Sequence, residues 1–341
     1  MNHSCTPIPF FSSLRNRFQL VLFLMTLAIG LQFYFFVEQA GNGGPITIQR
    51  PAGVEGFLPI GALLGWKQLL TTGIWDPVHP AAMVILLYAG VISLLFRKSF
   101  CSWFCPVGTL SEWLWKLGYR VLGKNIQMPK VLDWPLRSLK YLLLSFFVYI
   151  TLIKMAPAEI ASFLHSPYYK LADVKMLHFF TRIGTVTLFS MVVLLVLSVF
   201  VRNFWCRYLC PYGALMGILG LFSPTAVQRQ PATCTSCLKC SRICPSHLPV
   251  HQKTRVFSPE CSGCLDCVNT CPAAETLSMN TAGFGPLSWH ASKLAMAVGA
   301  AFVVMVFAAQ ITGHWKSGID DGEFKMLLRM IDAPMMVHPT F

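Results

Sequence analysis

Five long apolar segments constrain this chain more than any other feature of its sequence. They cover residues 20–37, 78–96, 139–156, 183–201 and 294–313. Only the third carries charged residues, Lys140 and Lys154, near its ends. A helix needs roughly 20 mostly apolar residues to cross a bilayer. Charged residues make up 12% of the chain, against about 25% in soluble domains. We therefore predict an α-helical membrane protein with about five transmembrane helices, solvated by membrane lipid.

Lysine and arginine are distributed unevenly between the two sides that five spans would create. The N-terminus and the segments after the second and fourth spans hold 18 of the 27 Lys and Arg, but only 5 of the 14 Asp and Glu. Cytoplasmic loops carry such an excess. This predicts a multi-pass protein of the bacterial inner membrane with a cytoplasmic N-terminus and a periplasmic C-terminus. The net charge of +13 is then explained by anionic lipid, and no nucleic acid partner is expected.

Eight of the 13 cysteines form two identical runs. The runs are Cys234, Cys237, Cys240, Cys244 and Cys261, Cys264, Cys267, Cys271, each followed by Pro. This C-x2-C-x2-C-x3-C-P spacing is that of bacterial two-cluster ferredoxins, in which the fourth cysteine ligates the other cluster. The predicted ligand sets for two [4Fe–4S] clusters are therefore Cys234, Cys237, Cys240 and Cys271, and Cys261, Cys264, Cys267 and Cys244.

Zinc and disulfides explain these runs less well. Zinc needs only two C-x2-C pairs, and the predicted cytoplasmic position keeps thiols reduced. We expect residues 224–287 to form a cytoplasmic α+β ferredoxin-like domain. It would be inserted between a four-helix membrane region, residues 1–223, and a fifth transmembrane helix at 288–313, with a periplasmic tail at 314–341.

A second cysteine motif occurs twice in the membrane region. Cys101-x3-Cys105-Pro follows the second apolar segment, and Cys206-x3-Cys210-Pro follows the fourth. The duplication predicts two helical-hairpin repeats whose corresponding positions meet. Proline suits the first position of a helix, so Cys105 and Cys210 should lie at helix N-termini, where the dipole stabilises thiolate. The four cysteines could hold an additional iron site or act as a redox pair; the alternative is that they are small buried residues.

Twin C-x3-C-P loops, four spans and a linked 2[4Fe–4S] domain together resemble a known family. From about Arg17 to Gly313, including the stretch Val54-Glu55-Gly56-Phe57-Leu58-Pro59-Ile60, the chain is similar to NapH-type quinol dehydrogenase membrane components and YccM-type electron transport proteins. The C-terminal half of NosR-type proteins is also similar. The resemblance implies oxidation of quinol from the quinone pool and electron transfer to a periplasmic or membrane-bound redox partner. The fifth span and the tail depart from the four-span NapH layout and leave that partner open.

Quinol oxidation releases two protons and needs a base near the membrane surface. Candidates on the predicted outer side are Glu55, His79, His178 and His314. For each of them, an ordinary residue of the membrane interface is the alternative interpretation. No haem is expected, because the sequence contains no C-x-x-C-H.

Three functions follow from these features. The leading prediction is an electron conduit from quinol through the two clusters, as the membrane subunit of a quinol dehydrogenase. The second reverses the flow, from a cytoplasmic donor to quinone or to a metal ion during enzyme maturation. The third, of another class, is an iron–sulfur membrane sensor or assembly scaffold.

Overall fold

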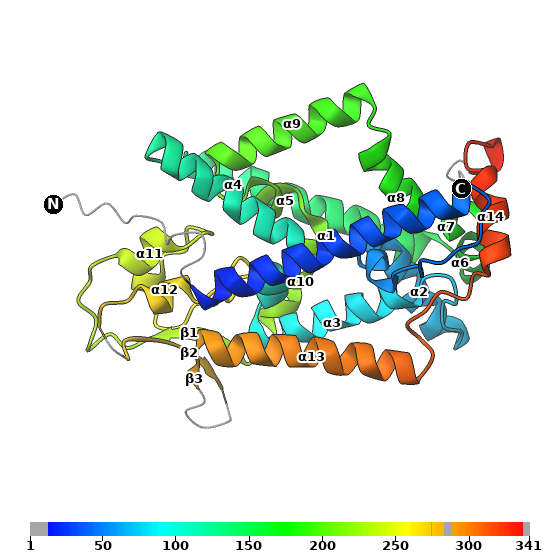
Figure 1. Cartoon of the computed structure of the whole chain (residues 1–341). Helices are drawn as coiled ribbons and strands as arrows, with labels where there is room; N and C mark the ends of the chain where they lie inside the picture. Colours follow the sequence, from blue (N-terminus) through cyan, green and yellow to red (C-terminus); the bar gives the residue numbers. More distant parts are fainter. Residues whose placement is uncertain (1–12, 274, 283–287, 337–341) are drawn as a thin grey trace. The chain divides into compact units, whose positions relative to one another are not determined.

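The computed structural model describes residues 13–273, 275–282 and 288–336 and is mostly helical (Figure 1). The α-helices are α1 (Leu14–Gly41), α2 (Pro59–Thr72), α3 (Pro80–Phe96), α4 (Pro106–Leu122), α5 (Lys130–Val148), α6 (Pro157–Leu164), α7 (Pro167–Lys170), α8 (Ala172–Thr181), α9 (Thr185–Phe200), α10 (Pro211–Leu221), α11 (Lys239–Ile243), α12 (Asp266–Asn269), α13 (Ala291–Ile311) and α14 (Asp321–Arg329). The strands are β1 (Thr225–Arg229), β2 (Leu277–Thr281) and β3 (Ser288–Trp289). Short 3-10 helices cover Ala52–Phe57, Val250–Gln252 and Pro334–Met336, and π-helices cover Phe100–Phe104, Tyr149–Lys154 and Trp205–Leu209.

The chain divides into two compact units, which are described separately below. The first unit comprises Met1–Phe23, Ala89–Leu144 and Met191–Ala301, and the second comprises Leu24–Tyr88, Ser145–Ser190 and Phe302–Phe341. All twelve described cysteines belong to the first unit.

Three helices are long and apolar enough to cross a membrane. They are α1, α13 and the continuous helix Lys130–Lys154, which joins α5 to the π-helix after it. Helices α8 and α9 qualify only as a pair, and they meet at a bend of 77°. The predicted second span is α3, which is apolar but only 17 residues long. The described residues thus supply three or four candidate spans, and the total of five stays a prediction.

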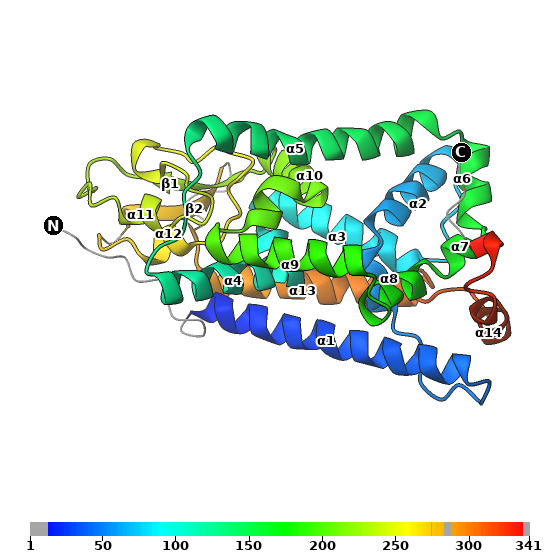
Figure 2. The ribbon, with the colours of Figure 1, turned by 90° about the horizontal axis from the view of Figure 1, so that it is seen from above.

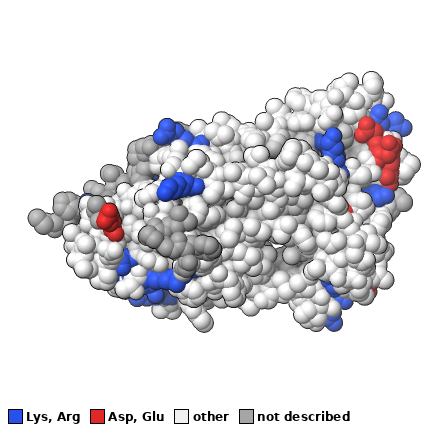
Figure 3. All heavy atoms as spheres, turned by 90° about the horizontal axis from the view of Figure 1, so that it is seen from below, with Lys and Arg blue, Asp and Glu red and all other residues white. Residues whose placement is uncertain are grey.

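Large apolar side chains cover the outside of these helices. Val21, Leu24 and Leu27 of α1 are more than half exposed, as are Val303 and Phe307 of α13. The face of the protein seen in Figure 3 is largely free of Lys, Arg, Asp and Glu. Soluble proteins rarely expose apolar surface of this extent, whereas hydrocarbon solvates it. The chain is therefore a membrane protein.

Helix α4 turns its apolar face outward and its polar face inward. Val107 and Val121 are exposed, whereas Glu112 and Lys116 are buried. This is the reverse of an amphipathic helix on a soluble protein and suits a helix that borders lipid. A Cβ at Gly118 would lie 1.9 Å from a backbone oxygen of α9, so glycine lets α4 and α9 lie side by side (Figure 2).

The polar part of the first unit is built around a three-stranded sheet in the order β1–β2–β3. Strand β1 pairs antiparallel with β2, from Thr225 opposite Thr281 to Arg229 opposite Leu277. Helices α11 and α12 contact each other, and each begins inside one of the two cysteine runs. The predicted domain boundary at residue 287 lies outside the described residues.

The second unit has two apolar cores. Phe33 and Phe36 at the end of α1 pack with Val174 of α8 and Phe324 of α14. In the other core, helices α2 and α6 pack against each other through a cluster that includes Leu64, Ile160 and Leu164.

Candidate metal centres

One cavity of the first unit is lined by four cysteines, Cys244, Cys261, Cys264 and Cys267. This set consists of three cysteines of the second run and the last cysteine of the first run. Apolar side chains complete the wall, namely Val227, Leu248, Val250, Val256 and Leu265. We call this space the buried cavity, because Cys244 and Cys267 are each only 9% exposed. Such an apolar shell limits solvent access to a bound redox centre.

A second cavity is lined by Cys234, Cys237, Cys240 and Cys271. Here three cysteines come from the first run and one from the second. Its wall also contains Arg229 and His251. We call this space the exposed cavity, because Cys237 is exposed to solvent. The two cavities therefore differ in how close a soluble molecule can come.

The donor sets fit iron–sulfur clusters. Thiolates are soft ligands that select iron–sulfur centres, and four cysteines hold one [4Fe–4S] cluster. All twelve described cysteines are free thiols. Among residues 13–273, 275–282 and 288–336, no three His, Cys, Asp or Glu side chains form a compact site for a single metal ion. The four cysteines instead surround each cavity.

The two runs share one backbone conformation. Residues with positive φ occur at matching positions, Ser236 and Leu238 in the first run and Gly263 and Leu265 in the second. These left-handed residues bend each run around its cavity. A Cβ at Gly263 would lie 2.5 Å from Ser99 Oγ, so only the second run needs glycine there.

The twin loops, residues 97–105 and 202–210, are also alike. Each contains a π-helix, and each ends at a cysteine followed by Pro at the start of α4 or α10. Cys105 N donates to Phe100 O and Cys210 N to Trp205 O, both at 3.0 Å. The prediction that Cys105 and Cys210 lie at helix N-termini is confirmed. The π-turns were not predicted; such turns occur frequently at functional sites.

Burial dominates the chemistry of the twin-loop thiols. It raises the pKa of Cys101 to about 12 and that of Cys105 to about 11. Backbone N–H groups oppose the rise at Cys105, and Gly213 N donates to Cys210 Sγ at 3.3 Å. The stabilised thiolate expected at Cys105 is therefore not found, since burial outweighs the helix terminus. A bound metal would replace the thiol protons.

Lys98 lies among these four cysteines and is 6% exposed. Burial acts to lower its pKa, but Cys101 and Glu260 beside it raise the pKa overall. The corresponding residue of the second loop is Asn203, so the repeat is asymmetric in charge. A buried ammonium group here compensates the negative charge that thiolate ligands would bring.

The first twin loop holds the second cysteine run directly. Ser102 Oγ donates to Ser262 O at 2.6 Å, and Trp103 Nε1 donates to Gly263 O at 3.0 Å. A third cavity is lined by residues of both twin loops, including Cys101 and Cys206, and by residues of the second cysteine run. It shares part of its wall with the buried cavity, namely Pro245, Ser246, Glu260, Ser262 and Cys264. The buried cavity is thus the one adjacent to the twin loops.

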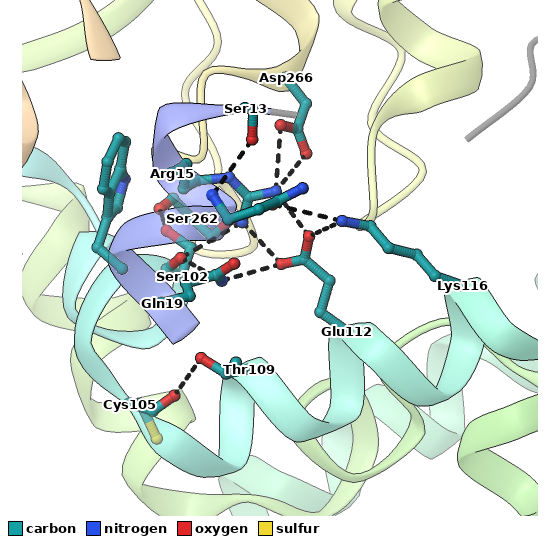
Figure 4. A network of polar contacts seen from close by, with 12 residues as sticks. Ser13, Arg15, Gln19, Ser102, Cys105, Thr109, Glu112, Lys116, Ser262 and Asp266 are labelled. Carbon is teal, nitrogen blue, oxygen red and sulfur yellow. Dashed lines mark hydrogen bonds and ion pairs between the residues drawn. The ribbon is translucent and has the colours of Figure 1, made fainter. Parts of the chain in front are cut away.

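Buried ion pairs fix the second run against the helices (Figure 4). Arg15 of α1 lies 2.7 Å from Glu112 of α4 and 3.0 Å from Asp266, at the start of α12. Lys116 also pairs with Glu112, at 2.6 Å. Burial alone would raise the pKa of Glu112, but Arg15 and Lys116 hold that pKa well below its usual value. Glu112 therefore stays ionised inside the protein.

A second ion pair lies at the start of the same run. Lys140 of α5 lies 2.6 Å from Glu260, which precedes Cys261, and Tyr141 O–H donates to the same carboxylate. Burial acts to raise the pKa of Glu260, but Lys98 and Lys140 lower it overall. Glu260 lines both the buried cavity and the third cavity. A fixed negative charge therefore stands between them.

The structure brings together two of the four candidate quinol residues. Glu55 and His79 are buried in the second unit, and His79 Nδ1 lies 3.4 Å from Glu55 Oε1. Glu55 accepts hydrogen bonds from Ala81 N and Ala82 N at the start of α3. His79 Nε2 lies 2.9 Å from Tyr169 O, and a carbonyl only accepts. Nε2 therefore carries a proton, and Nδ1 faces the carboxylate.

The other two candidates have different surroundings. His178 is part of α8, and the His314 ring packs against Trp75 with centroids 4.6 Å apart. Within the part of the chain that the structure describes, no hydrogen bond or ion pair joins either of them to Glu55 or His79. The quinol role of all four residues stays a prediction.

The sequence reasoning missed the charged residues around the cysteines. They are Arg15, Lys98, Glu112, Lys116, Lys140, Glu260 and Asp266. The available signal was position, because Lys98, Glu260 and Asp266 lie within three residues of a cysteine. Glu112 and Lys116 are four residues apart on α4, but Arg15 and Asp266, and Lys140 and Glu260, are remote in sequence and leave no local pattern.

Two family models match the chain. A 4Fe-4S binding domain matches residues 78–127 and, a second time, residues 183–229. A 4Fe-4S dicluster domain matches residues 226–272. The first covers both twin loops, and the second covers both cysteine runs. No solved structure matches the chain.

Curated relatives agree with these matches. The chain is 44% identical to YccM of Escherichia coli, a protein named for electron transport, over 95% of this chain and 91% of that protein. It is 29% identical to the protein NirI of Paracoccus denitrificans, over 56% of this chain and 28% of that protein. It is 26% identical to the ferredoxin-type protein NapH of Escherichia coli, over 49% of this chain and 55% of that protein. The chain therefore belongs to the NapH/YccM-type family of 4Fe-4S membrane proteins.

Proposed function

We propose that this protein transfers electrons from membrane quinol to a redox partner protein through two [4Fe–4S] clusters. One observation carries the proposal: each cavity is lined by three cysteines of one run and the last cysteine of the other. A [4Fe–4S] cluster, when bound, supplies one-electron redox chemistry. The name of the relative YccM, which describes electron transport, supports the same function.

The eight cysteines have separate roles in this proposal. Cys261, Cys264, Cys267 and Cys244 hold the cluster of the buried cavity. Cys234, Cys237, Cys240 and Cys271 hold the cluster of the exposed cavity. Cys244 belongs to the first run but would ligate the cluster of the buried cavity, and Cys271 belongs to the second run but would ligate the cluster of the exposed cavity. This exchange also keeps the two sites close together.

The shared cavity walls support an order of electron transfer. The buried cavity borders the twin loops, which follow apolar helices, and the exposed cavity reaches solvent. Electrons from quinol would therefore pass the twin-loop end first, then the buried site, then the exposed site.

We also propose that Cys101, Cys105, Cys206 and Cys210 hold an additional iron site. The family model that matches both loops is a 4Fe-4S binding domain, and Lys98 supplies a compensating charge. Packing alone would not need a buried cation among four thiols.

The membrane arrangement is part of the same proposal. Five spans in two helical-hairpin repeats would place residues 224–287 on the cytoplasmic side of a bacterial inner membrane and the tail at 314–341 in the periplasm. The double match of one family model and the excess of Lys and Arg in alternate segments support it.

A second candidate function is the reverse flow, from a soluble cytoplasmic donor to quinone. The exposure of Cys237 favours it, because a soluble carrier can approach the exposed cavity directly. The membrane-anchored sensor or scaffold is a third candidate, and it requires no turnover with quinol.

Reconstitution tests the leading proposal. The anaerobically purified protein is placed in lipid nanodiscs with reduced ubiquinol or menaquinol, and cluster reduction is followed by EPR. Reduction within the mixing time of a manual assay, absent from a Cys261→Ser variant that keeps its fold, is expected. Clusters that are reduced by dithionite but by no quinol would overturn quinol as the donor.

A further inference from the structure

One basic residue lines the exposed cavity, and four more belong to the same part of the chain. Arg229 lines the cavity, and Lys239 and Arg242 belong to α11, which begins inside the first cysteine run. Arg229 N donates to Thr254 O at 2.7 Å, and Arg229 Nε donates to Lys253 O. The backbone of Arg255 forms a β-bridge with Gln228 of β1, and its side chain donates to Pro224 O at 3.4 Å. We call Arg229, Lys239, Arg242, Lys253 and Arg255 the basic rim.

Internal ion pairs bury two of the three acidic residues of this part of the chain. The basic rim comprises every Lys and Arg of residues 224–287, and the only acidic residues there are Glu260, Asp266 and Glu275. Glu260 and Asp266 are 8% and 7% exposed and pair with Lys140 and Arg15. Among the described residues of this range, Glu275 is thus the one surface acid. The described surface of residues 224–287 therefore carries more basic than acidic side chains.

We propose that the basic rim docks an acidic, soluble one-electron carrier protein, and that electrons are exchanged there through the exposed cavity. This rests on the two-cluster function proposed above. A positive surface steers an acidic partner and orients it at contact. Each encounter exchanges one electron: the reduced carrier is oxidised and the cluster held by Cys234, Cys237, Cys240 and Cys271 is reduced, or the reverse. No bond is made and no proton is required.

A charge-reversal variant tests the docking. Arg242→Glu, Lys253→Glu and Arg255→Glu are combined, since all three side chains are exposed. The control is Arg329→Glu on α14, which is also exposed but belongs to the second unit. The full-length holoprotein in detergent is titrated with a labelled acidic flavodoxin, and binding is measured by fluorescence anisotropy. Electron transfer from dithionite-reduced flavodoxin is followed by stopped-flow absorbance.

The expected results are specific in sign. Wild-type binding should weaken as ionic strength rises. The triple variant should bind flavodoxin at least about tenfold more weakly and accept electrons from it at least about tenfold more slowly. The control variant should match wild type in both measurements. A basic cytochrome c should show no such loss with the triple variant. Equal binding by the triple variant, or binding that is insensitive to salt, would overturn the docking proposal.

Two further measurements keep the outcomes apart. Iron content and dithionite reduction are measured for every variant. A wild-type protein without clusters would refute the two-cluster function itself, whereas intact clusters without salt-sensitive docking would refute only the docking at the basic rim.

Co-sedimentation with phosphatidylglycerol and phosphatidylcholine vesicles tests a lipid partner. If the triple variant no longer binds phosphatidylglycerol vesicles but still binds flavodoxin as wild type does, the basic rim contacts the membrane and the docking proposal is wrong.

Discussion

The guanidinium of Arg15 lies 3.0 Å from the carboxylate of Asp266, 251 positions later in the chain. The pair joins the start of the first membrane helix to the loop between Cys264 and Cys267, and both side chains are buried. Glu112 completes the group from α4. The cysteine run of the buried cavity is therefore attached to the helices by charge as well as by apolar packing.

Replacing Arg15 should loosen this attachment. Arg15→Met leaves Asp266 buried without its cation, and breaking a buried ion pair in this way costs about 3–5 kcal/mol. We expect a lower thermal unfolding temperature and loss of iron from the buried site. Arg17→Met is the control, because Arg17 is exposed and such residues contribute little. Equal unfolding temperatures and equal iron contents of the two variants would show that the ion pair does not stabilise the second cysteine run.

Acidification should release the same region. The pKa values of Glu112 and Glu260 are held below their usual range by Arg15 and by Lys98 and Lys140, against the effect of burial. Their contribution to stability is full above pH of about 4.3, the value in the unfolded chain, and is lost as pH falls through the lower folded values. Unfolding temperature measured against pH should therefore drop below that point. The Glu112→Gln variant should show a smaller decrease in unfolding temperature below this pH. A pH dependence of the unfolding temperature that is parallel to wild type would contradict the role assigned to Glu112.

The two glycines after the C-x3-C-P motifs should respond differently to alanine. A Cβ at Gly108 would lie 2.2 Å from Cys101 O, whereas a Cβ at Gly213 would lie no closer than 3.4 Å to any neighbour. Gly108→Ala should therefore cost about 1–3 kcal/mol through overpacking, and Gly213→Ala should cost less. The comparison uses folded yield and unfolding temperature in the same detergent. A larger loss for Gly213→Ala would mean that the loops pack otherwise.

The twin-loop cysteines should contribute iron beyond the two clusters. Two [4Fe–4S] clusters account for about eight irons per chain. The wild type should exceed this value, and Cys105→Ser combined with Cys210→Ser should return it to about eight. Iron and acid-labile sulfide are measured after anaerobic purification. Unchanged iron together with unchanged electron transfer would leave packing as the role of these residues.

Local sequence spacing predicted which cysteines line the same cavity. The cysteines that meet at each cavity were grouped from spacing alone, because a fixed short spacing dictates how a loop surrounds a cluster. Cys105 and Cys210 were placed at helix N-termini because Pro follows each. The raised pKa of Cys105 was not predictable in this way, since its burial depends on segments elsewhere in the chain.

Long-range pairing was out of reach for the same reason. Arg15 was counted among the cations that attract anionic lipid, yet it is buried against Glu112 and Asp266. Nothing near Arg15 in sequence signals those partners. Apolar length alone does not give the number of spans either, because the segment at 78–96 forms only a 17-residue helix and that at 183–201 forms α9, which bends sharply from α8.

One iron measurement tests the central claim, the exchange of the fourth cysteine between the two runs. In a background with Cys105, Cys210, Cys261, Cys264 and Cys267 all changed to Ser, the chain should keep about four irons, all in the exposed site. Adding Cys244→Ser should leave that iron in place, whereas adding Cys271→Ser should remove or convert the cluster, as read by iron content and EPR. Loss with Cys244→Ser and retention with Cys271→Ser would contradict the account.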